Sequence, residues 1–129
     1  MSQANFEYKG AFETLEVWKE ARAFRNKIWE LVKLFPVDEK YQLISQIVRS
    51  SRSIGNNISE GYGRYHFKDN IKFCRNARGS LMETLDHLFI AVDLKYIDQQ
   101  TFNEFKDTYD KLLKLINGYI HYLKTKDGQ

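Results

Sequence analysis

The chain has few of the residues that interrupt a fold or cross-link it. Its 129 residues include one cysteine, one proline and seven glycines. One cysteine excludes an internal disulfide framework, and so few prolines and glycines argue against a fold of many short strands. No apolar run approaches the ~18 to 20 residues that cross a bilayer, and no signal peptide opens the sequence. We therefore expect a helical protein of the cytoplasm with no membrane segment.

Apolar side chains are abundant, at 43% of the residues, with 15% aromatic. They recur at steps of three and four in four segments, which is the spacing of helices that bury one side. The predicted buried seams are Ala21, Phe24, Ile28, Leu31 and Phe35; Ile44, Ile47, Ser51, Ile54, Ile58 and Gly61; Phe67, Ile71, Cys74, Arg78, Leu81, Leu85, Leu88 and Val92; and Phe102, Phe105, Tyr109, Leu112, Ile116, Tyr119 and Leu123. Four such helices of roughly 22 to 28 residues with short connections predict an all-α, antiparallel up-down-up-down four-helix bundle.

Short breaks separate the four segments. Pro36 ends the first helix, and Asp38 is a suitable N-cap for the second. Gly61-Tyr62-Gly63 provides a C-terminal stop, and Asp98 can cap the fourth helix. The domain prediction is an N-terminal arm at residues 1–13, the bundle at residues 14–124 and a frayed tail at residues 125–129.

Positive charge is concentrated in the middle of the chain. Residues 45–80 have a net charge of +5, whereas the whole chain has +3. We predict a nucleic-acid-binding face formed by Arg49, Arg52, Arg64, Lys68, Lys72 and Arg75. Lys68, Lys72 and Arg75 follow the i, i+4, i+7 spacing of one helical face, which suits contact with a phosphate backbone. The alternative is an ordinary solvated charged face.

The residue patterns of catalytic and metal sites are missing. The three histidines are dispersed, and Glu83 and His87 lack the second carboxylate–histidine unit of a dinuclear site. We expect His87 at the surface or a helix boundary, and Cys74 as a buried structural thiol. The glycines of SIGNNISEGYGRY, residues 53–65, do not follow a strand, so they do not form a nucleotide loop. The prediction is a protein without catalytic, cofactor-binding or metal-binding residues.

Arg78 interrupts the apolar seam of the third segment. A guanidinium on a core seam needs acceptors, because an unpaired buried charge is costly. We predict a structural polar network in which Arg78 pairs with Glu60 or Glu83 and Asn57 takes part. A buried ligand site or active site around Glu60 and Arg78 is the less favoured alternative.

A second surface lies on the first helix. Trp18, Arg22, Arg25 and Trp29 recur at steps of four, three and four, roughly 110° from the core seam. Tryptophan and arginine are enriched at interface hot spots, so these four residues are the predicted oligomer interface. Simple flanking of the core and stacking on unpaired bases remain alternatives.

Four stretches together resemble a bacterial four-helix-bundle family named for proteins encoded in intervening sequences of 23S ribosomal RNA genes. They are LEVWKEAR (15–22), FP (35–36), SIGNNISEGYGR (53–64) and ARGSLMET (77–84). The positions that match the family are Trp18, Arg49, Ser53, Asn57, Glu60, Gly61, Arg64, Arg78, Gly79, Ser80 and Glu83. Gly55, Ser59 and His66 depart from the pattern, since relatives commonly have proline, alanine and a small capping residue there.

The resemblance implies a left-turning up-down bundle that assembles as a ring-like homo-oligomer, a pentamer, without catalytic activity. It also implies an association with ribosomal RNA or other structured nucleic acid. We therefore expect a non-enzymatic homo-oligomer that binds RNA through its basic face. The alternative is a scaffold or accessory module whose surfaces serve only self-assembly and partner binding.

Overall fold

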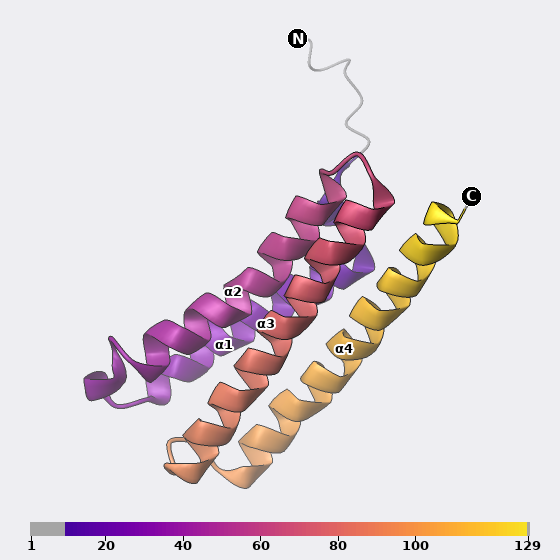
Figure 1. Ribbon diagram of the computed structural model, residues 1–129. Helices are drawn as coiled ribbons and strands as arrows, with labels where there is room; N and C mark the ends of the chain where they lie inside the picture. Colours follow the sequence, from indigo (N-terminus) through magenta and orange to yellow (C-terminus); the bar gives the residue numbers. More distant parts are fainter. Residues whose placement is uncertain (1–9, 129) are drawn as a thin grey trace.

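The computed structural model describes residues 10–128, so most of the predicted N-terminal arm lies outside the described residues (Figure 1). The elements, with η for a short 3-10 helix, are η1 (Phe12–Thr14), α1 (Glu16–Leu31), η2 (Val32–Leu34), η3 (Val37–Glu39), α2 (Leu43–Tyr62), α3 (Phe67–Asp93) and α4 (Gln99–Asp127). Residues 10–128 contain four α-helices and no strand, which confirms the all-α class and the four-helix bundle. None of the helices described is long and apolar enough to span a membrane.

Each helix packs on two neighbours. α1 contacts α2 and α4, and α3 likewise contacts α2 and α4. Figure 1 shows the α1–α2 and α3–α4 connections at one end of the bundle and the α2–α3 connection at the other. The start of α1 and the end of α4 therefore lie at the same end as the α2–α3 connection.

The helix lengths differ from the prediction on the N-terminal side. α1 and α2 have 16 and 20 residues, whereas α3 and α4 have 27 and 29. α1 passes into η2 at Val32, and Phe35 is extended, with ψ at 152°. Pro36 is the physical reason, because its ring disfavours the α conformation in the residue before it. At the other end of the chain α4 continues to Asp127, past the predicted end of the bundle at residue 124.

The predicted seams form most of the core. Every residue of the first seam is buried, and the second seam is buried from Ile47 to Gly61. Phe24, Ile28, Ile54, Leu81 and Leu112 have no exposed surface. The hydrophobic effect on these side chains is the main force that holds the four helices together.

The two predicted N-caps have different outcomes. The Asp98 carboxylate accepts a hydrogen bond of 2.8 Å from the Thr101 backbone N–H, which confirms it as the cap of α4. The prediction for Asp38 is wrong, because residues 37–39 form η3 and α2 begins at Leu43. There the Glu39 carboxylate accepts from the Leu43 N–H at 3.2 Å and also from the Tyr96 hydroxyl at 2.7 Å.

Gly61 allows close packing at the end of the bundle where α2 connects to α3. It lies buried in the last turn of α2, and the Gly63 N–H then bonds to the carbonyls of Ser59 and Glu60. A Cβ atom on Gly61 would lie 2.5 Å from Asn70 Oδ1 and 2.9 Å from Phe73 Cβ. The absence of a side chain is therefore what lets the first turns of α3 pack so closely on α2.

Candidate nucleic-acid interface

The first turns of α3 present three cations to solvent. Lys68, Lys72 and Arg75 are all exposed, and their i, i+4, i+7 spacing places them on one side of the helix. No hydrogen bond or ion pair joins these three side chains to another residue within 10–128. We call this surface the α3 cationic face, and its charges are available to a phosphate chain.

Arg64 lies just before α3, at the end of α2. Its guanidinium forms a 3.1 Å ion pair with Glu60 and lies 4.7 Å from the centre of the Phe73 ring. Roughly half of each charged side chain is exposed, so the pair contributes little to stability. These contacts hold Arg64 beside the α3 cationic face, although Glu60 offsets part of its charge.

Arg49 and Arg52 form a separate group. They lie 12 to 15 residues before Arg64 on α2, which corresponds to roughly 18 to 22 Å along the helix axis. Arg49 is 3.7 Å from the Glu83 carboxylate, and the Arg52 guanidinium lies 5.3 Å from the centre of the Trp29 ring. The six residues of the predicted basic face thus divide into one group on α3 and Arg64, and another near the middle of α2.

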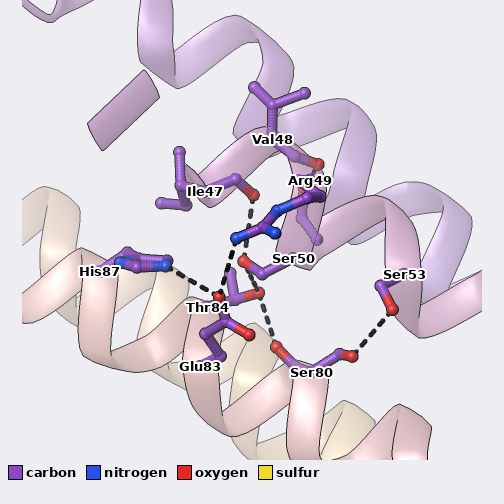
Figure 2. A network of polar contacts seen from close by, with 10 residues as sticks. Ile47, Val48, Arg49, Ser50, Ser53, Ser80, Glu83, Thr84 and His87 are labelled. Carbon is purple, nitrogen blue, oxygen red and sulfur yellow. Dashed lines mark hydrogen bonds and ion pairs between the residues drawn. The ribbon is translucent and has the colours of Figure 1, made fainter. Parts of the chain in front are cut away.

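Small hydroxyl side chains join α2 to α3 (Figure 2). The Ser50 and Thr84 hydroxyl oxygens lie 2.8 Å apart, and both residues are buried. One turn along, the Ser80 hydroxyl donates to the Ser53 hydroxyl at 2.9 Å. Hydrogen bonds are directional, so this ladder of short polar contacts favours one register of α2 against α3.

A charged cluster borders this ladder. Figure 2 shows the Arg49 guanidinium and the His87 ring both directed at the Glu83 carboxylate, which His87 Nε2 approaches to 3.3 Å. His87 is only 7% exposed, so the expectation of a surface or boundary position is wrong. With its proton on Nε2 the ring donates to Glu83, and Nδ1 is then a buried acceptor with no partner among residues 10–128.

The predicted network around Arg78 is not formed. The Arg78 guanidinium donates to the Asn117 side-chain oxygen on α4 at 2.7 Å, whereas Glu60 pairs with Arg64 and Glu83 with Arg49. The predicted pairing of Arg78 with Glu60 or Glu83 is therefore wrong. Ala77, with no exposed surface, occupies the core seam in place of Arg78. A step of three from Cys74 fits a helical seam as well as a step of four, so the apolar spacing pointed to the wrong neighbour.

Asn57, the fourth member of the predicted network, bonds within its own helix. Its side-chain N–H group donates to the backbone carbonyl and the hydroxyl of Ser53, at 2.9 and 3.0 Å. Because Ser53 also accepts a hydrogen bond from Ser80, Asn57 helps to hold the Ser53 hydroxyl in place for the contact between α2 and α3.

The residues of the predicted oligomer interface all lie on α1, where Arg25 donates to the Asn26 side-chain oxygen at 2.9 Å. The Trp18 ring is partly buried over Gly55 of α2, where a Cβ atom would lie 3.3 Å from its Nε1, and the Arg22 guanidinium lies 5.7 Å from the ring centre. Trp29 is 48% exposed, and the Arg52 guanidinium lies over its ring. Trp18 thus belongs partly to the α1–α2 packing, while Trp29 offers a free aromatic surface.

Two further observations concern metal binding and the reactivity of the cysteine. No group of three or more histidine, cysteine, aspartate or glutamate side chains between residues 10 and 128 could hold a metal ion. Burial raises the pKa of the Cys74 thiol to about 11, so the group is protonated and unreactive near neutral pH.

Comparison with known proteins places this geometry among related bundles. The family described as 23S rRNA-intervening sequence protein matches residues 13–118. A crystal structure of a protein of unknown function from the S23 ribosomal protein family of Bacteroides thetaiotaomicron is similar, with a TM-score of 0.73 at 26% sequence identity. That alignment covers 81% of this chain and 97% of the other. No curated protein matches the sequence significantly.

Proposed function

The chain belongs to the 23S rRNA-intervening sequence protein family, and from this premise we propose that it is a non-enzymatic homo-oligomer of the cytoplasm that binds structured RNA. Ribosomal RNA is the leading candidate, and the α3 cationic face is the proposed contact surface. The ring-like pentamer that the resemblance implies is part of the same proposal.

The observation that supports RNA binding best is the state of the three cations. Lys68, Lys72 and Arg75 are exposed on one side of α3 and have no carboxylate partner among residues 10–128. Some other cations on the bundle are held by carboxylates: Lys106 pairs with Asp110 at 2.7 Å and Lys111 with Glu20 at 3.3 Å. What distinguishes the α3 cationic face is that three cations, unpaired within the described chain, share one side of a helix. A phosphate backbone supplies the anions that the α3 cationic face lacks, and the displaced counterions favour the complex.

The test is the salt dependence of RNA affinity. The logarithm of the association constant for a ribosomal RNA helix is expected to fall linearly with the logarithm of the salt concentration, by about 0.9 per phosphate contact. The variant with Lys68→Glu, Lys72→Glu and Arg75→Glu should bind weakly, with a slope smaller by about 2 to 3. Fluorescence anisotropy at several salt concentrations measures both quantities.

A matched control places the same charge changes on α4. Lys111→Glu, Lys114→Glu and Lys124→Glu give the same formal net charge on another part of the bundle. This variant should retain most of the RNA affinity of the parent protein. Equal losses in the two variants, or binding that does not depend on salt, would contradict the assignment of the α3 cationic face.

A second candidate function, self-assembly without RNA, is favoured by Trp29. A half-exposed tryptophan stacked with an arginine has the composition of an interface hot spot. Trp29→Ala, alone and combined with Trp18→Ala, should lower the mass measured by light scattering, while Leu34→Ala, at another exposed apolar side chain, should not. Assembly lost with RNA binding intact would assign this surface to subunit contact, and RNA binding absent at low salt would favour the scaffold function alone.

A further inference from the structure

A pocket of about 320 Å³ lies at the end of the bundle where α2 passes into α3 and α4 ends. Five aromatic side chains from three helices and the α2–α3 connection line it. They are Tyr62, Tyr65, Phe67, Tyr119 and Tyr122. We call it the tyrosine pocket. It is separate from the α2–α3 hydroxyl ladder. One of its lining residues, Phe67, directly precedes Lys68 of the α3 cationic face.

Four of these five rings have a large exposed fraction. Tyr65 is 90% exposed, Tyr122 is 52% exposed, and Tyr62 and Phe67 are 42% and 43% exposed. The Tyr119 and Tyr122 rings are nearly parallel, at an interplanar angle of 12° with centroids 6.3 Å apart. Flat aromatic surfaces with one free side are the usual platform for a stacked base, because every base has a π-face.

The inner wall of the pocket has a fixed polar group. Asn70 is 6% exposed, and its side-chain N–H group lies 3.4 Å from the Tyr119 hydroxyl, to which it donates. Its oxygen faces Gly61, where a Cβ atom would lie only 2.5 Å away, and it also accepts from the Cys74 thiol at 3.5 Å. These bonds tie the Tyr119 ring to α3 and keep it in place as a wall of the pocket.

The residues that line the pocket include a cation and no carboxylate, although Arg64 is paired with Glu60 beside it. A second cation, Lys126, lies 5.5 Å from the centre of the Tyr122 ring. Lys68 follows Phe67 directly on α3, and the cationic face extends about 10 Å from there to Arg75. Phosphates that follow this face would bring a neighbouring nucleotide to the mouth of the tyrosine pocket.

We propose that the tyrosine pocket binds an unpaired nucleobase of the RNA whose phosphates lie on the α3 cationic face. The inference rests on the proposed RNA-binding function and deepens it. A paired base cannot enter, because its faces are stacked on its neighbours, so the protein is expected to prefer loops, bulges and strand ends to continuous duplex.

The experiment compares two labelled RNA probes at the same low salt concentration. One is a hairpin with an unpaired loop, and the other is a continuous duplex with the same number of phosphates. The full chain should bind the hairpin about tenfold more tightly, the gain expected from one stacked base. The Tyr65→Ala, Tyr122→Ala variant should lose that preference and keep its duplex affinity. Both rings are exposed, so the variant should fold, and thermal unfolding checks this.

Two further variants separate this inference from the proposed function. Tyr122→Phe keeps the stacking surface and should keep the hairpin preference. The triple charge reversal at Lys68, Lys72 and Arg75 should weaken both probes alike. Equal affinity of the parent protein for hairpin and duplex would overturn the base-binding pocket while leaving the cationic face intact. No binding of either probe would overturn both, and a loss of assembly with unchanged hairpin preference in the double tyrosine variant would assign the pocket to a subunit contact.

Discussion

The α2–α3 interface and the α1–α4 interface are built from different kinds of side chain. α2 and α3 meet through Gly61 and the hydroxyls of Ser50, Ser53, Ser80 and Thr84. α1 and α4 meet through large rings, such as Phe24 and Phe105 with centroids 6.4 Å apart. Beside Phe105 the second interface leaves an open groove of about 570 Å³.

The two kinds of interface have different physical consequences. Small side chains let two helices approach closely, and their directional hydrogen bonds tolerate one register. Large apolar side chains remove more surface from water, and packing without directional bonds tolerates small shifts. We infer that the α1–α4 side is stabilised mainly by apolar burial. The α2–α3 side is the more extensive contact, and it also holds Arg64, the α3 cationic face and the tyrosine pocket in position.

The largest effect should come from the apolar side. Phe24 has no exposed surface, so Phe24→Ala is expected to lower the free energy of unfolding by about 3 to 5 kcal/mol. Leu34→Ala is the control, because that side chain is 68% exposed and its loss should cost within about 0.5 kcal/mol. Denaturant unfolding measures both. A loss of less than about 1 kcal/mol for Phe24→Ala would contradict a stabilising role for the apolar contact between α1 and α4.

Alkaline pH should weaken the same core through Cys74. Burial raises the pKa of its thiol from 9.0 to about 11 in the folded chain. The unfolded chain therefore releases this proton first, so the contribution is fully present below pH 9 and is lost as the pH rises toward 11. The loss amounts to at most about 2.7 kcal/mol. Cys74→Ala should remove this part of the alkaline decline, and an unchanged decline would show that other groups cause it.

A methyl group at Gly61 should disturb the close α2–α3 contact. Gly61→Ala places Cβ against the Phe73 Cβ and the Asn70 backbone, so we expect a destabilisation of about 1 to 3 kcal/mol. Gly79→Ala is the matched control in a helix, because no atom lies within 4 Å of its Cβ position. That variant should be stabilised by about 0.8 to 1 kcal/mol, the difference in helix propensity. The same sign for both variants would show that the contact at Gly61 is not tight.

The smallest effect should come from a single hydroxyl of the ladder. Thr84→Val keeps the shape of the side chain and removes the partner of Ser50, so a loss of about 1 kcal/mol is expected. Thr125→Val, at an exposed position of α4, should change the free energy of unfolding by less than about 0.5 kcal/mol. Thermal unfolding of the two variants compares them, and equal midpoints would argue against a register role for the ladder.

The fold was largely predictable because its signals are local. The three-and-four spacing predicted four helices and most of their buried positions, and Asp98 was recognisable as a cap from its place before α4. In α3 it missed the buried residues Asn70, Ala77, Thr84, His87 and Ala91. The start of α2 was not, because the chain between Pro36 and Leu43 forms η3 and a turn that follow no helical pattern. The candidate site was only partly predictable: the i, i+4, i+7 cations share one face, but their separation from Arg49 and Arg52 depends on where α2 ends.

The sequence by itself determined the helices, their buried sides and the basic middle of the chain, since each depends on residues within a few turns of one another. Only the tertiary structure decided which side chains meet across helices. It gave Arg78 the Asn117 partner, brought Arg49 of α2 to the carboxylate that His87 meets within α3, and gathered rings from distant segments into the tyrosine pocket. The physical reason is that a helical repeat of 100° leaves neighbouring positions such as 77 and 78 equally suited to a seam, and only packing against the adjacent helix selects between them.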